Sequence, residues 1–335
     1  MTSILPSGRL SRRLQHLWNA HPPMFVSMLA TVALGVFFLA GLLLDPRYVT
    51  GAPVWLKPLK FAVSITVYSL TLLWMIGFLK PSRLLRASLW VILSMLALEW
   101  VAIILQASRG VSSHFNMSTP FDAAVWIGLM AVPIAVLWTA NVVLAVVVLR
   151  ARFGDPVLAW GIRLALVITV LGMAEGYLMT GPTTQQMAAL QAGGALTAIG
   201  AHTVGLQDGG PGLPVLGWST RGGDLRAAHF VGMHALQVLP LLAWLLSLPA
   251  LAGALSQRQR VRLVQIAAGL YLGLTGLLVW QALRGQSLVS PDARTLAVLV
   301  ALIGVAGLAA MLTLNGQPGR MTGERVRAED GPEAS

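Results

Sequence analysis

The residues best placed to do chemistry are charged side chains that interrupt long apolar stretches. Glu99 lies near the middle of the apolar run 86–107, with no other charged residue close to it. A carboxylate at that depth in a membrane is costly, so it is a functional candidate by default. We interpret Glu99 as a candidate proton carrier. The alternative is a structural glutamate neutralised by Lys60, Arg109 or Tyr68.

Two further apolar runs carry polar stripes. Each residue of an α-helix turns about 100°, so residues three or four apart share one face. A polar stripe in a spanning helix should face protein or water, not lipid. The alternative is helix packing through hydroxyls and amides, with the lysines extending to the membrane surface. The first stripe is Lys57, Lys60, Ser64, Tyr68 and Thr71, and the second is Arg226, His229, Met233, Gln237 and Pro240.

Four histidines fall in the outer half of the predicted topology: His114, His202, His229 and His234. They are the candidate metal ligands, since the chain has no cysteine. His229 and His234 are five residues apart, whereas two ligands on one helix are usually four apart, as in H-E-x-x-H. Separate hydrogen-bonded histidines are therefore expected. The cofactor stays unknown, with haem or a metal ion as the open alternatives.

The elements that position these residues follow from composition. The chain has 335 residues, of which 56% are hydrophobic and 10% charged, and its net charge is +11. Soluble domains carry about 25% charged residues. Soluble, secreted disulfide-bonded and disordered classes are therefore excluded. The basic residues lie between apolar runs and not on one face, which argues against nucleic acid. The fold class is an all-α polytopic membrane bundle in a lipid bilayer.

Eight apolar runs are long enough to cross a bilayer, which needs about 20 residues. With both termini inside, each of the five inner segments holds three Lys or Arg residues, fifteen of the 23 in the chain. This bias predicts that both termini are cytoplasmic. The predicted spans are 24–44, 59–79, 86–107, 122–149, 158–180, 228–249, 261–283 and 294–314, after a cytoplasmic segment 1–23.

Two segments outside the apolar runs are long enough to need their own interpretation, the outer loop and the C-terminal tail. The long outer loop 181–227 contains Thr183 and Gln186, the pattern of a capping box for a short helix through Gln191. We expect the loop to form a lid on the outer face, and the alternative is a loose surface loop. Residues 315–335 are polar and charged, which is typical of a disordered cytoplasmic tail.

An internal duplication is predicted from two matching segments. Gln106-Ala-Ser-Arg109-Gly-Val-Ser closes the third run, and Gln281-Ala-Leu-Arg284-Gly-Gln-Ser closes the seventh. The second and sixth spans both open with Leu followed directly by a basic residue, and Phe stands four positions after the basic residue. Chance is the alternative. We expect two parallel four-helix halves, about 24–150 and 158–314, and such interfaces often hold ligands.

The blocks W-L-K-P-L-K-F, Q-A-S-R-G-V-S-S-H-F-N and G-D-L-R-A-A-H-F-V-G-M-H-A-L-Q resemble those of an uncharacterised family of bacterial polytopic integral membrane proteins. This resemblance implies a location in the bacterial inner membrane and no activity. Eight spans in two halves are also similar in outline to haem A synthase. That family has haem-ligating histidines in both halves. The first-half runs here contain no histidine, and this departure argues against that identity.

Three functions remain open. The first is an outward-facing binding or transport site for an anionic, amphiphilic small molecule or lipid between the halves. Its candidate residues are Lys57, Lys60, Tyr68, Glu99, Gln106, Arg109, Arg226, His229, His234, Gln237 and Arg284. The second is a membrane redox enzyme or haem protein that uses the outer histidines, with Met117 and Met233 as soft ligands.

The third function is a lipid-headgroup hydrolase or transferase that uses Ser112, Ser113, His114 and Asp122. Whether the protein is an enzyme, and its oligomeric state, do not follow from the sequence.

Overall fold

The computed structural model describes residues 9–316 and is almost entirely helical. Eight of its helices are long and apolar enough to span a membrane, which confirms the all-α polytopic fold. The predicted tail lies outside the described residues, apart from its first two positions. The first half comprises α1 (Arg9–Ala20), α2 (Pro22–Leu44), β1 (Tyr48–Val49), β2 (Ala52–Pro53), α3 (Leu56–Ile76), α4 (Arg83–Arg109), α5 (Pro120–Ala124), the π-helix η1 (Val125–Ala131) and α6 (Val132–Arg150).

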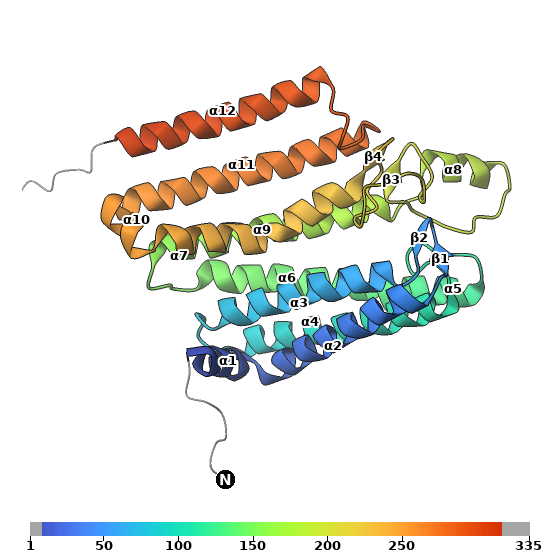
Figure 1. The fold of residues 1–335 in the computed structure, drawn as a ribbon, viewed down its shortest axis with the longest axis horizontal. Helices are drawn as coiled ribbons and strands as arrows, with labels where there is room; N and C mark the ends of the chain where they lie inside the picture. The colour runs from blue at the N-terminus through green and yellow to red at the C-terminus, as the bar shows by residue number, and fades with distance from the viewer. Residues whose placement is uncertain (1–8, 317–335) are drawn as a thin grey trace, which may run out of the picture.

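The second half follows without a long linker. It comprises α7 (Pro156–Ala174), the 3-10 helix η2 (Glu175–Met179), α8 (Thr184–Gln191), β3 (Thr203–Val204), β4 (Gly223–Asp224), α9 (Leu225–Leu246), α10 (Pro249–Ala254), α11 (Gln257–Leu283) and α12 (Ala293–Asn315). In Figure 1 the spans α2, α3, α4 and α6 form one group and α7, α9, α11 and α12 the other. Helices α6 and α7, and α3 and α9, contact each other across the boundary.

Helices α7 and α9 approach most closely at two glycines. A Cβ atom added at Gly172 would lie 2.5 Å from the backbone of Gly232, and Gly161 faces Ala243 in the same way. Small residues at a helix interface let two backbones approach and increase dispersion contact. The second half is therefore assembled around the α7–α9 pair.

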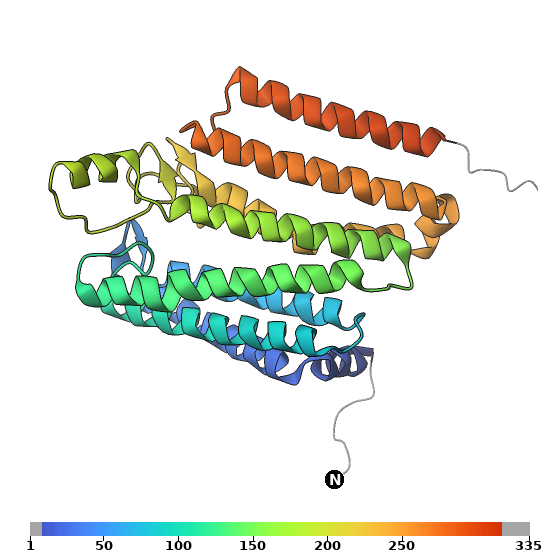
Figure 2. The same cartoon turned by 180° about the vertical axis from the view of Figure 1, so that it is seen from behind.

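The two ends of the bundle differ. Figure 2 shows α8 and the irregular segments around it extending from one end, where α5 also lies. Loop 181–227 is joined to the first half there, because Met117 N donates to Thr197 O at 2.9 Å and Ile199 N donates to Phe115 O at 3.0 Å. The expected lid is thus packed on the bundle, and the predicted capping box of Thr183 and Gln186 is confirmed at the start of α8.

Three local features depart from the sequence prediction. Segment 1–23 contains a helix, α1, that was not predicted. The second and sixth spans begin three residues earlier than expected, at Leu56 and Leu225. A π-helix, η1, interrupts the fourth span just before Pro133. Proline removes the amide hydrogen that would bond to Leu129 O, and a π turn shifts the hydrogen-bond pattern around that loss.

Candidate functional site

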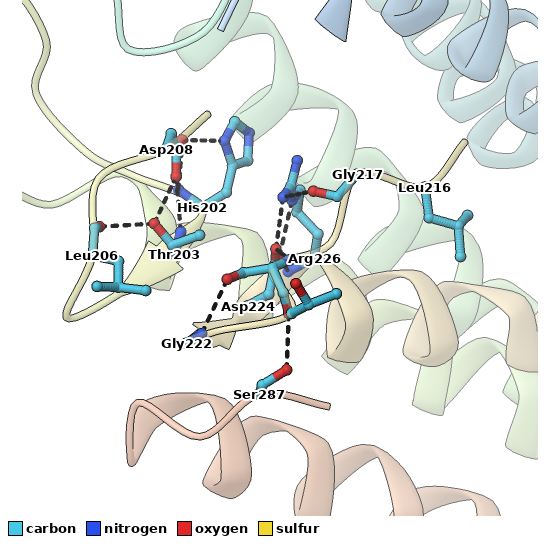
Figure 3. Close-up of polar contacts among 12 residues, drawn as sticks. His202, Thr203, Leu206, Asp208, Leu216, Gly217, Gly222, Asp224, Arg226 and Ser287 are labelled. Atoms are coloured by element: carbon cyan, nitrogen blue, oxygen red, sulfur yellow. Dashed lines mark hydrogen bonds and ion pairs between the residues drawn. The ribbon is translucent and has the colours of Figure 1, made fainter. Parts of the chain in front are cut away.

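Asp208 organises the loop that covers the predicted outer end. Its carboxylate accepts hydrogen bonds from the amides of His202 and Thr203, at 3.1 and 3.0 Å, and from Thr203 Oγ1 at 2.9 Å. His202 Nδ1 lies 2.5 Å from Asp208 Oδ2 (Figure 3). Burial acts to raise the pKa of Asp208, but hydrogen bonds from His202 and Thr203 hold it well below its usual range. The carboxylate thus fixes the orientation of the His202 ring.

A second aspartate, Asp224, neutralises Arg226. Asp224 is 3% exposed and caps α9 by accepting from Arg226 N at 3.1 Å. Its two oxygens also accept from Arg226 Nε at 2.9 Å and Nη2 at 2.6 Å, and Arg226 Nη2 donates to Gly217 O (Figure 3). Arg226 was a predicted ligand residue, and its charge is already compensated within the chain.

The two lysines of the first stripe differ in their contacts. Lys60 Nζ donates to Leu216 O at 3.0 Å and so ties α3 to the loop. Lys57, one turn earlier and half-buried, forms no ion pair or hydrogen bond within residues 9–316. Helical side chains lean toward the helix N-terminus, so Lys57 extends toward the start of α3. No side chain caps that helix end, whose N-cap residue is Trp55.

His114 lies among aromatic side chains close to this lysine. Its ring centroid is 5.5 Å from that of Trp126 and 6.2 Å from that of His202, and Ser113 Oγ lies 3.1 Å from its Nδ1. Burial, followed by the positive charge of Lys57, holds the pKa of His114 well below 6.5. His202 has a lowered pKa for the same first reason, despite its bond to Asp208. Both imidazoles are therefore neutral at pH 7.

The other two histidines point in different directions. His229 Nδ1 donates to Gly172 O of α7 at 2.7 Å. His234 Nδ1 donates to Phe230 O at 2.8 Å, and its ring stacks on Phe230 with centroids 3.9 Å apart. The sequence predicts that His229 and His234 do not bind one ion together, and in the structure the two rings bond to different carbonyl groups. Within the described chain, no group of three or more His, Asp or Glu side chains is arranged to hold a metal ion.

Glu99 is buried in α4 and is only 3% exposed. Its Oε1 has no hydrogen-bond partner among the described residues. Lys57 lies within electrostatic range of this carboxyl group, without forming an ion pair. An unpartnered carboxyl group in this position favours its protonated form, because water cannot solvate its charge.

The matching ends of α4 and α11 have nearly the same geometry. Gly110 and Gly285 adopt positive φ, 72° and 71°, and the residue after each donates an amide hydrogen back to Gln106 O or Gln281 O. Arg109 contacts Asp122 at 2.5 Å and also Gln106, while Arg284 contacts Asp292. These predicted ligand residues instead join each helix end to the next helix.

The polar stripes of α3 and α9 meet at one point. Gln237 Nε2 donates to Thr71 Oγ1 at 3.1 Å, an amide-to-hydroxyl contact of the kind expected from the alternative of helix packing. Tyr68 OH, in contrast, donates to Asn141 Oδ1 of α6 at 2.7 Å. An outward-opening cavity between the halves stays a prediction, because the two hollows described on this chain lie elsewhere.

The predicted Ser–His–Asp grouping is not assembled. Asp122 is 2% exposed and is held by Thr119, Gln106 and Arg109. None of these contacts connects it to His114. The roles of Asp208 and Asp224 were not predicted from the sequence. The fold of the loop brings Asp208 to His202, whereas Asp224 lies only two residues before Arg226. A signal was available at Asp224, which directly precedes an apolar run as N-cap residues do.

No protein-family model, curated protein or solved structure matches this chain.

Proposed function

We propose that the protein binds, and moves across or within the membrane, an anionic and amphiphilic small molecule or lipid at the predicted outer end of the two helix groups. Lys57 is the central anion-binding residue of this site. His114 and His202 form its wall, and Glu99 below it carries a proton that is exchanged with the ligand. The location proposed is the bacterial inner membrane, with both termini in the cytoplasm.

The observation that carries this proposal is the difference between the starts of α3 and α9. At α9, the carboxylate of Asp224 caps the helix and pairs with the basic residue two positions later. At α3 the equivalent positions are Trp55 and Lys57, and no side-chain carboxylate caps the helix or pairs with Lys57 within the described residues. Free amide groups and an unpaired cation at one helix end attract an anion.

The comparison of these two helix ends rests on the proposed duplication of four spans. The matched ends of α4 and α11 support it, as does the pairing of α2 with α3 and of α7 with α9. In this duplication the carboxylate of Asp224 stands in one half where a bound anion stands in the other. A carboxylate or phosphate monoester therefore fits the site.

The proposal is tested by anion-dependent thermal stability of the protein in lipid nanodiscs. Octanoate and inorganic phosphate are the probes, and Lys57→Met is the test variant. A ligand at a hundredfold excess over its Kd stabilises the folded state by about 2.7 kcal/mol. We expect one of these anions to stabilise the wild-type protein and the Lys57→Met variant to lose that gain.

Lys80→Met is the matched control, since Lys80 is exposed at the other end of the bundle. Equal stabilisation of the two variants, or none in the wild type by either anion, would contradict the proposed site.

A further inference from the structure

A shallow groove lies at the opposite end of the bundle from Lys57, where α7 and α11 begin. It has a volume of about 270 Å³ and is open to the surroundings. The residues that line it are Pro156, Gln257, Arg258, Val261, Arg262 and Gln265. It shares no residue with the proposed anion site, so the inference drawn from it goes beyond the proposed function.

Two arginines give the groove its charge. Arg258 and Arg262 are four residues apart, so they lie on the same face of α11. Both side chains are exposed, and neither forms an ion pair within the described part of the chain. Asp155, which directly precedes the groove residue Pro156, accepts hydrogen bonds from Val157 N at 2.8 Å and Ser247 Oγ at 2.8 Å. The groove therefore presents two uncompensated guanidinium groups.

The position of the groove selects the kind of anion. Both α7 and α11 are apolar enough to span a membrane, and the groove opens between their first turns. It therefore lies at the depth of lipid headgroups. Val261 and Pro156 supply an apolar wall beside the arginines, which suits the glycerol backbone of a phospholipid. Basic pockets between spanning helices are known binding places for anionic headgroups.

We propose that this groove binds the phosphate of an anionic glycerophospholipid. Arg258 and Arg262 contact the phosphate oxygens, and Gln257 or Gln265 donates to the headgroup. Guanidinium groups suit phosphate because their planar donors match two oxygens at once. The lipid's acyl chains then lie along α11, whose apolar face is largely exposed.

The test uses the full-length protein in nanodiscs of equal phosphatidylcholine and phosphatidylglycerol. Native mass spectrometry after release counts the lipids that stay bound. Each basic residue near a membrane surface contributes about 1 kcal/mol to anionic-lipid attraction, and about 1.4 kcal/mol corresponds to a factor of ten, so the double variant Arg258→Gln/Arg262→Gln should retain phosphatidylglycerol roughly thirtyfold less. Arg294→Gln removes an exposed charge at the opposite end and should retain as much as the wild type.

Three results would overturn the proposal. One is equal retention by the double variant and the Arg294→Gln control. Another is displacement of the lipid by inorganic phosphate at low concentration, which would identify a free-phosphate site. The third is a loss that disappears when residues 317–335 are removed, since the groove would then hold the acidic tail. Melting temperatures in phosphatidylcholine-only nanodiscs check that both variants fold. None of these results depends on ligand binding at Lys57.

Discussion

At the scale of single residues, the basic side chains of the predicted outer end fall into two groups. Arg109, Arg226 and Arg284 each contact an aspartate close to them in sequence. Such pairs hold helix ends together and leave little net charge for a ligand. Lys57 has no such partner in residues 9–316, and it sits beside neutral histidines and the buried Glu99. The pattern of pairing, more than the number of charges, distinguishes the candidate site.

We expect Lys57→Met to raise the pKa of His114. Burial is the first cause of the low pKa and stays in the variant, so the pKa should rise only part of the way toward 6.5. A histidine that is harder to protonate when folded adds stability above its unfolded pKa, and this stability is lost as the pH falls below about 6.5. As the pH falls from about 6.5 through the folded pKa of His114, the variant should therefore lose less stability in total than the wild type.

Histidine NMR titration and melting temperatures at each pH are the measurements. Lys80→Met serves as the control, because Lys80 lies far from His114. An unchanged His114 titration in the Lys57→Met variant would mean that the lysine does not act on the ring.

At the scale of helices, close backbone contact matters more than composition. Gly172 and Gly304 both lie inside spanning helices, but only Gly172 faces another backbone. Alanine normally favours a helix over glycine by about 1 kcal/mol. The two positions therefore separate the effect of helix propensity from that of packing.

We expect Gly172→Ala to lower the free energy of unfolding by about 1–3 kcal/mol, because the added methyl group overlaps the backbone of Gly232. Gly304→Ala, with open space around it, should be neutral or slightly stabilising. Unfolding in mixed micelles of increasing denaturing detergent measures both. Equal effects of the two substitutions would show that α7 and α9 do not rely on this contact.

At the scale of the whole molecule, the described basic residues of the predicted inner segments lie at one end of the bundle. These lysine and arginine residues lie near helix ends such as the start of α4 and the start of α11, and these helix ends lie opposite α8 (Figure 1). An excess of basic residues marks the cytoplasmic side of a membrane protein. The orientation proposed above follows from this rule.

Reporter fusions test this orientation directly. Fusions at Ser113 and Gly209 should be active for a periplasmic reporter, and fusions at Arg83 and Arg260 for a cytoplasmic one. The reason is that each pair of positions lies at one end of the bundle. A reversal of either pair would require a different number of spans or the opposite orientation.

The sequence alone determined the number of spans, the class of fold and the short helix α8. Apolar length and local capping patterns are properties of consecutive residues, so they need no knowledge of neighbours in space. The helices begin one to four residues before the predicted spans, because helix caps extend beyond the apolar core, and α7 ends six residues before its predicted span does. Helix α1 was overlooked because it is short and most of its residues are polar, so it does not stand out as an apolar run.

Only the tertiary structure decided which charges remain without a partner. Asp208 meets His202 because loop 181–227 folds back on itself, and Ile199 contacts Phe115, which lies about a quarter of the chain earlier. Span lengths and helical faces do not reveal such loop contacts. The contact of Gln237 with Thr71 was foreseeable from the two stripes, because helical periodicity fixes a face and a spanning helix turns its polar face inward. The unpaired state of Lys57 within residues 9–316 could not be foreseen in this way, because it depends on where every nearby carboxylate lies in the folded chain.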